Sequence, residues 1–185
     1  QVARAGFQQS GVSRNNRMIE RHSLSTGAYW ESFDFAGNRE RQSFFLFPLG
    51  PQHAFGAFSE EFGFLHDGGE IIFNLPNGLQ GYYLTDHLGQ RLDTGPTKIV
   101  QDLSRRDQAV TNGISCMSCH NLGMQMKEDQ VREYALGHLA FPKEVRDIIA
   151  EIFPEKEEMT MLMEGDRDRF LRALEGGGGG PGLQL

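Results

Sequence analysis

The chain has 185 residues, of which 38% are hydrophobic, and a formal net charge of −7 at neutral pH. This length and composition predict one compact domain rather than two. The acidic balance argues against nucleic acid or an anionic membrane as partner, and a basic partner would be better matched. No apolar run is long enough to span a membrane, and the start QVARAGFQQS lacks the order of a signal peptide, so we expect a mature chain or a fragment.

The first forty residues are polar and then become rich in aromatic side chains. Residues 11–22, GVSRNNRMIERH, have the composition of a charged, solvated face. Residues 28–35, AYWESFDF, partly alternate between apolar and polar side chains, which favours a strand. Residues 43–47, SFFLF, form a short apolar run closed by a proline and a glycine, which also predicts a strand.

The clearest local pattern is a hairpin over residues 70–85, EIIFNLPNGLQGYYLT. Two β-rich runs flank Pro76-Asn77-Gly78, and an Asn-Gly pair suits a tight turn that needs positive φ angles. A second turn at 86–90, DHLGQ, would return the chain through RLD. These patterns predict a small antiparallel β unit in the first half of the chain.

Helical patterns begin after residue 113. In residues 141–153, FPKEVRDIIAEIF, the apolar residues recur at the spacing of one helix face, with prolines suited to the start and the stop of the helix. A second helix is expected from about Asp166 to Leu174. The tail of residues 176–185 holds five consecutive glycines and cannot bury surface, so we expect a linker or a disordered end.

These elements predict an α+β fold. A central antiparallel β unit with hairpins is followed by a helical region. We expect one domain over residues 1–175, with a β-rich part at 1–95, a helical part at 96–175 and the flexible tail at 176–185.

Both cysteines of the chain lie in the motif Cys116-Met117-Ser118-Cys119-His120. C-x-x-C-H is the spacing that attaches a c-type haem. The two thiols add across the vinyl groups of the porphyrin, and the adjacent histidine offers its imidazole to the iron as the proximal ligand. The motif therefore predicts one covalent haem c held by Cys116, Cys119 and His120.

Three other interpretations of the motif stay open. A zinc site needs two more ligands, and His138 does not give the usual second pair. A thioredoxin-like site requires a C-x-x-C after a strand in a βαβ unit, and no alternating β/α pattern is present. A plain structural disulfide is the third option.

The sixth position of the iron decides what a haem here could do. Local context favours His66 as the distal ligand, because it precedes the hairpin and Asp67 is near enough to orient it. His22 is the second candidate. The other histidines are expected to be exposed: His53, His87 and His138.

The methionines are rival ligands, and an empty sixth position is a further option. Met124 and Met126 are too near His120 in sequence to reach the opposite face, so they should pack along the attachment helix. The cluster EEMTMLM at residues 157–163 is better explained as core filling. Arg17 or Arg21 could pair with the haem propionates, because a guanidinium binds carboxylates with two hydrogen bonds.

Several strings resemble a group of bacterial exported proteins with one c-type haem, of the kind met in planctomycetes. The strings that carry the resemblance are RAGFQQSGVSRNNRMIERH, GAYWESFDFAGN, HDGGEIIFNLPNGLQGYYL, RLDTGP and NGISCMSCHNLGM. The resemblance extends to about Leu174 and implies a cytochrome-like, exported protein that continues further at its N-terminus. It carries over Cys116, Cys119 and His120 as attachment residues, and it assigns no sixth ligand.

Two functional classes follow. The first is an electron-transfer cytochrome that meets a redox partner protein at a transient interface. The second is a peroxidase-like enzyme or small-ligand-binding protein with an open distal face, using His66 or His22 and an arginine. A haem-stabilised structural domain is a third option. Because haem is joined to C-x-x-C-H outside the cytoplasmic membrane, a periplasmic or extracellular location is expected.

Overall fold

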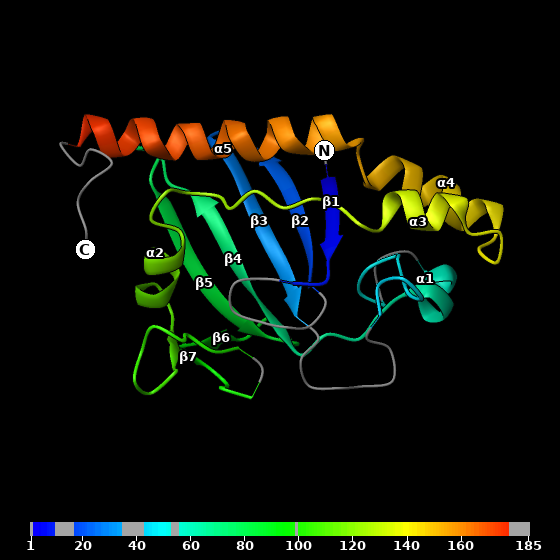
Figure 1. The fold of residues 1–185 in the computed structure, drawn as a ribbon, viewed down its shortest axis with the longest axis horizontal. Helices are drawn as coiled ribbons and strands as arrows, with labels where there is room; N and C mark the ends of the chain where they lie inside the picture. Colours follow the sequence, from blue (N-terminus) through cyan, green and yellow to red (C-terminus); the bar gives the residue numbers. More distant parts are fainter. Residues whose placement is uncertain (1, 10–16, 35–42, 53–55, 99, 178–185) are drawn as a thin grey trace.

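A computed structural model describes residues 2–9, 17–34, 43–52, 56–98 and 100–177 (Figure 1). Its main element is an antiparallel sheet in which six strands follow one another in chain order. These strands are β1 (Val2–Phe7), β2 (Arg17–Leu24), β3 (Gly27–Asp34), β4 (Gly68–Asn74), β5 (Gln80–Asp86) and β6 (Arg91–Leu92). A small second ribbon pairs β7 (Thr94–Gly95) with β8 (Val110–Thr111).

The helices, apart from a short one between β3 and β4, follow the strands in sequence. They are α1 (Ala57–Phe62), α2 (Ile114–Cys119), α3 (Arg132–Gly137), α4 (Lys143–Ile152) and α5 (Lys156–Gly176). An antiparallel sheet followed by helices confirms the predicted α+β class.

The register of the strands gives the sheet two different faces. Side chains alternate along each strand, so Ile19, Trp30 and Ile72 lie on one face, which we call the site face. Met18 and Phe33 lie opposite each other on the other face, which we call the core face.

The core face of the first three strands is covered by apolar side chains of distant segments. Met18 and Phe33 join one buried cluster with Phe44, Leu49 and Phe64 and with residues of α3 and α4. The α4 residues Val145 and Ile149 are fully buried, as the helical spacing predicts. This cluster is the largest apolar core of the described chain.

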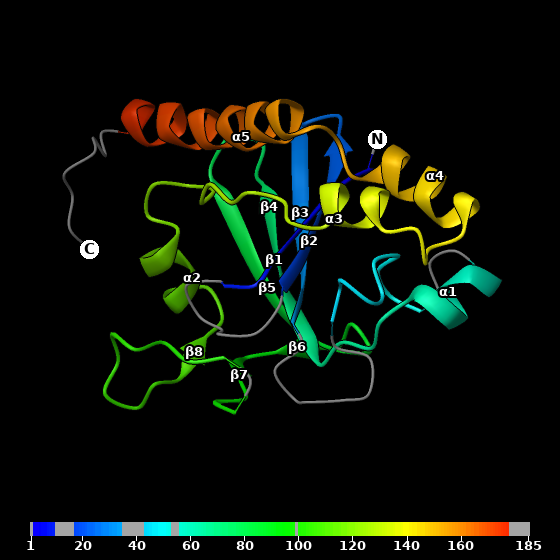
Figure 2. The same ribbon diagram turned by 45° about the vertical axis from the view of Figure 1, so that its right-hand side comes forward.

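The site face is covered by α5 and by the segment from α2 to α3. In Figures 1 and 2, α5 runs across one end of the strands, and the chain after α2 crosses the same side toward α3. Met159 and Met163 of α5 pack with the apolar residues of the site face. Asp166 accepts hydrogen bonds from Arg21 Nε and Trp30 Nε1, both at 2.8 Å.

The predicted hairpin and its return turn are confirmed. β4 and β5 pair from Gly68↔Asp86 to Asn74↔Gln80. The loop between them is longer than a two-residue turn, because the Leu75 N–H donates to the carbonyl of Leu79, and Gly78 has a φ of 87°. The next turn, with Gly89 at φ 75°, leads into β6.

Four expectations from the sequence need correction. Residues 43–47 form no strand but a turn closed by Ser43, and their rings fill the core. Residues 17–22 are not a solvated face but part of β2, where Arg17 and Glu20 are buried. The helix expected from Asp166 begins at Lys156 and includes the methionine cluster. β1 was not anticipated.

Two further findings concern the limits of the chain. Within the described ranges, no helix has the length and apolar character to cross a membrane. Of the glycine-rich tail, Gly176 ends α5 and Gly177 follows it, whereas residues 178–185 lie outside the described residues.

Candidate functional site

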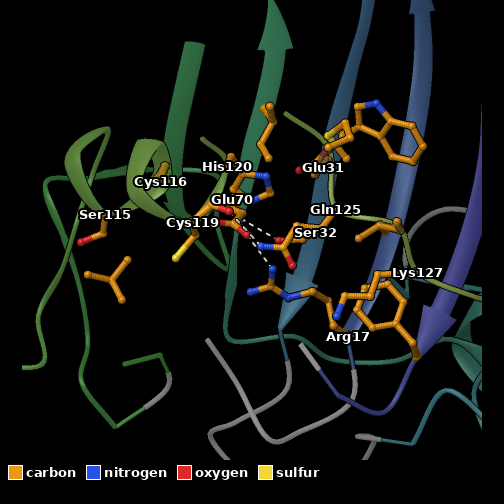
Figure 3. A pocket seen from close by; sticks show the side chains of 16 residues that line it. Arg17, Glu31, Ser32, Glu70, Ser115, Cys116, Cys119, His120, Gln125 and Lys127 are labelled. Carbon is orange, nitrogen blue, oxygen red and sulfur yellow. Dashed lines mark hydrogen bonds and ion pairs between the residues drawn. The ribbon is translucent and has the colours of Figure 1, made fainter. Parts of the chain in front are cut away.

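Helix α2 faces the site face of the sheet across a pocket that contains all three residues of the C-x-x-C-H pattern (Figure 3). Cys116, Cys119 and His120 form one wall. The remaining lining is mixed, with apolar, polar and charged members: Phe7, Arg17, Ile19, Trp30, Glu31, Ser32, Glu70, Ile72, Val110, Ser115, Met124, Gln125 and Lys127. The cavity measures about 70 Å³.

Helix α2 is fixed at both ends by side-chain hydrogen bonds. At its start, Ser115 Oγ accepts the N–H of Thr111 at 3.1 Å, which ties α2 to β8. At its end, Gln125 Nε2 donates to the carbonyl of Cys119 at 3.1 Å and satisfies one of the orphan carbonyls of the last turn. The motif is therefore held as one helical turn with defined orientation.

His120 is held in one tautomer by the backbone. Its Nδ1 lies 3.1 Å from the carbonyl oxygen of Gly123, and because a carbonyl only accepts, Nδ1 carries the proton. Nε2 then keeps its lone pair, the state that a metal-ligating histidine requires. Gly123 has a φ of 83°, and a Cβ there would meet Phe170 at 3.1 Å, so glycine is needed at this turn.

The two thiols are free and their environment favours the protonated form. Burial, followed by the charge of Glu70, raises the pKa of Cys116 to about 11. Burial also raises the pKa of Cys119, with Asp102 and Glu70 adding to the effect. Thiols that exchange disulfides have lowered pKa values beside positive charge. The site therefore lacks the electrostatics of a thioredoxin-like redox disulfide.

A buried charge cluster lies beside the motif, on the site face. Arg17 donates from Nε and Nη2 to the two carboxylate oxygens of Asp34, at 2.7 and 3.1 Å. Its Nη1 donates to Glu70 at 2.5 Å (Figure 3). Burial acts to raise the pKa of Glu70, but the charge of Arg17 and its hydrogen bond lower this pKa below its ordinary value. Burial raises the pKa of Asp34, and Arg17 offsets only part of that shift.

The structure separates the two arginines proposed for the propionates. Arg17 lines the pocket, but Asp34 and Glu70 already engage it. Arg21 does not line the pocket, because it binds Asp166 of α5 instead.

The structure does not bring the candidate distal histidines to the pocket. His66 lies edge-on to Phe33, on the core face, and lines a second pocket with His87. His22 is also directed to the core face, where its Nε2 lies 3.0 Å from Glu20 and its ring stacks on Tyr29. Among the described residues that line the motif's pocket, His120 is the only histidine.

The remaining histidines and the methionines differ in their exposure. His87 and His138 are exposed, as expected, and His53 lies outside the described residues. Met124 is buried and lines the pocket, whereas Met126 is exposed. Met159 and Met163 fill the core, as the sequence predicts, and Met161 is exposed.

Sequence reasoning missed most of the residues around the motif. Glu70 and Trp30 of the sheet and Lys127, which lies between α2 and α3, line the pocket, and the Tyr82 ring lies 6.2 Å from that of His120. One signal could have found Glu70, because it alternates with Ile72 and so shares the inward face of the predicted hairpin.

In the part of the chain that the structure describes, no group of three or more histidine, cysteine or acidic residues is arranged to hold a metal ion. Comparison with protein family models, with curated proteins and with solved structures finds no significant match to this chain.

Proposed function

We propose that the chain is a mono-haem c-type cytochrome, with haem c attached at Cys116 and Cys119 and His120 as proximal iron ligand. The observation that carries this proposal is the shared pocket wall. Cys116, Cys119 and His120 all line one cavity, and the hydrogen bond to Gly123 leaves Nε2 of His120 available to a metal. When bound, the haem would supply a one-electron redox centre.

The chemistry of the lining fits this group. Protonated, free thiols are the form present before they add to the vinyl groups, and apolar side chains such as Phe7, Ile72 and Val110 suit a porphyrin ring. The propionates need cations. Because Arg17 is engaged, Lys127 is the available one: it lines the pocket, its Nζ lies 5.6 Å from the centre of the Phe7 ring, and no ion pair with a described residue holds it.

The cavity beside the motif is small. A volume of about 70 Å³ is far below the roughly 300–1,000 Å³ of sites that hold organic ligands. The fit of haem therefore rests on the attachment residues and on the chemistry of the lining, and not on the volume of the cavity.

Electron transfer is the function that this arrangement supports best. Apolar side chains on the outer side of the motif are exposed, namely Ile114, Met117 and Leu122. They provide a small apolar contact area of the kind that transient redox partners use. We propose a periplasmic or extracellular location, because covalent attachment to C-x-x-C-H takes place outside the bacterial cytoplasmic membrane.

One observation favours a second candidate, a small-ligand-binding or peroxidase-like protein. Neither His66 nor His22 lines the pocket. Apart from His120, Met124 is the one described lining residue among the side chains considered as iron ligands. An open sixth position would admit a small molecule to the iron.

The test is an optical spectrum of the purified protein, oxidised, reduced, and reduced under carbon monoxide. The protein must be produced with a c-type haem attachment system. Covalent haem is retained after extraction with acidified acetone, and its absence from the wild type would overturn the proposal. Carbon monoxide leaves the spectrum unchanged if both axial positions are filled, which supports electron transfer. A large shift would instead support the ligand-binding function.

Trp30 gives an independent readout. It is the one tryptophan of the chain and lines the pocket. Attached haem should quench its fluorescence. Cys116→Ala should abolish retained colour and restore the emission. Ser118→Ala, at an exposed position inside the same motif, is the matched control and should change neither.

A further inference from the structure

On the basis of the proposed haem attachment, we propose that Glu70 sets the redox preference of the site. Its carboxylate places a buried negative charge beside the attachment motif, which favours the oxidised iron over the reduced iron. The pair of oxidised and reduced iron states differs by one electron, which is exchanged with the redox partner protein, and no bond is made or broken.

The position of Glu70 carries the first part of the argument. It lies on β4 and its side chain is 14% exposed. It lines the same pocket as Cys116, Cys119 and His120, and Figure 3 shows it close to the His120 ring. A charge at this place is shielded from bulk water and acts directly on the motif.

The charge balance of the cluster carries the second part. One guanidinium, that of Arg17, serves two carboxylates. Its Nε and Nη2 are used by Asp34, which leaves Glu70 a single hydrogen bond. Of the two carboxylates, only Glu70 lines the motif's pocket. Arg17 therefore holds Glu70 ionised without cancelling the negative charge of the cluster as a whole.

The predicted consequence is a shift of the reduction potential. The oxidised iron carries one more positive charge than the reduced iron, so a nearby carboxylate stabilises it. Two unit charges about 10 Å apart near a protein surface interact strongly enough to change an equilibrium constant by about tenfold. A tenfold change corresponds to about 59 mV for a one-electron couple.

The experiment is a spectroscopic redox titration of haem-loaded wild type and Glu70→Gln. We expect Glu70→Gln to favour the reduced form by about tenfold and so to raise the potential by about 59 mV. Glu70→Asp, which keeps the charge, should stay near the wild-type potential. Glu164→Gln makes the same change in net charge at an exposed position of α5 and should have no effect.

Glu70→Met is a second neutral variant of similar length, for use if Glu70→Gln does not fold. An unchanged or lowered potential in a folded, haem-loaded neutral variant overturns the role of Glu70 and leaves the proposed function standing. A wild type without covalent haem overturns the proposed function and this inference together, so the two failures are distinguishable.

Discussion

The two faces of the six-stranded sheet are built from adjacent residues of the same strands, yet their chemistry differs. On β2, Arg17 belongs to the charge cluster of the site face, whereas Met18 is fully buried on the core face. On β3, Phe33 joins the aromatic core and Asp34 binds Arg17.

This difference shows how the sheet divides its roles. The core face buries large apolar side chains in the largest cluster of the described chain, and such packing stabilises a fold. The site face keeps polar groups, a pocket and a helix of only six residues. Substitutions on the core face should therefore affect folding, and substitutions near the pocket should affect the chemistry of the motif.

The largest effect is expected on the core face. Phe64 is fully buried in its cluster, so Phe64→Ala should lower the free energy of unfolding by about 3–5 kcal/mol. Urea unfolding followed by circular dichroism measures it. Leu139→Ala, at a side chain that is 85% exposed, is the control and should change little. A loss for Phe64→Ala no larger than that of the control would remove the contrast between the faces.

The attachment of α5 to the site face depends on polar bonds as well as on packing. Asp166 is buried and accepts from Arg21 and Trp30, so Asp166→Ala should cost about 2–3 kcal/mol. In the haem-free protein, the emission of Trp30 should also shift, because its indole N–H loses its acceptor. An unchanged Trp30 emission in Asp166→Ala would show that the environment of the indole does not depend on its hydrogen bond to Asp166.

A pH-dependent effect is expected where the chain from α2 to α3 meets the edge of β1. Asp129 accepts the N–H groups of Gly6 and Arg132, at 2.7 and 2.8 Å. Burial raises its pKa, and these hydrogen bonds offset only part of the shift. In the window just above the ordinary aspartate pKa of about 3.9, the folded protein keeps a proton that the unfolded chain has released.

The contribution of Asp129 to stability should therefore fall as pH rises through that window. Asp129→Asn cannot titrate, so the free energy of unfolding of the wild type minus that of the variant should decrease with rising pH. Paired urea unfolding series at several pH values measure this difference. A difference that grows with pH would contradict the assigned direction.

The smallest effect is expected on the exposed side of α4, away from the core-face cluster. Lys143 and Asp147 form an exposed ion pair one helical turn apart, at 2.5 Å. Such pairs contribute little to stability, so the free energy of unfolding of Lys143→Ala should stay within about 0.5 kcal/mol of the wild-type value. Thermal unfolding at low and high salt measures it. A larger loss that persists at high salt would mean that stability is not concentrated on the core face.

The sequence predicted those elements whose signal is local. Asn77-Gly78 and the alternating residues around it mark the β4–β5 hairpin, and the apolar spacing of residues 141–153 marks α4. β1 was missed because VARAGF has few β-branched residues and takes its place by pairing with β2. The prediction for residues 17–22 was wrong because cross-strand partners neutralise their charges, as Arg4 of β1 does for Glu20.

The site was predictable only in part for the same reason. The C-x-x-C-H spacing is continuous in sequence and identified Cys116, Cys119 and His120. The alternation of the hairpin gives the face on which Glu70 lies, but only the folded sheet brings that face to the motif. His66 and His22 were judged by their neighbours in sequence, but strand alternation and loop packing direct both to the core face.

The order of the elements along the chain has a consequence for biogenesis. All six strands of the meander precede Cys116 in sequence, and each pairs with its neighbour in the chain. Pairing is fast where the connecting loop is short, as between β4 and β5, whereas β3 and β4 pair across residues 35–67. A unit that precedes the rest of the chain can fold while the rest is still being made. The sheet can thus form one wall of the pocket before the motif emerges. α5, which emerges last, then completes the cover.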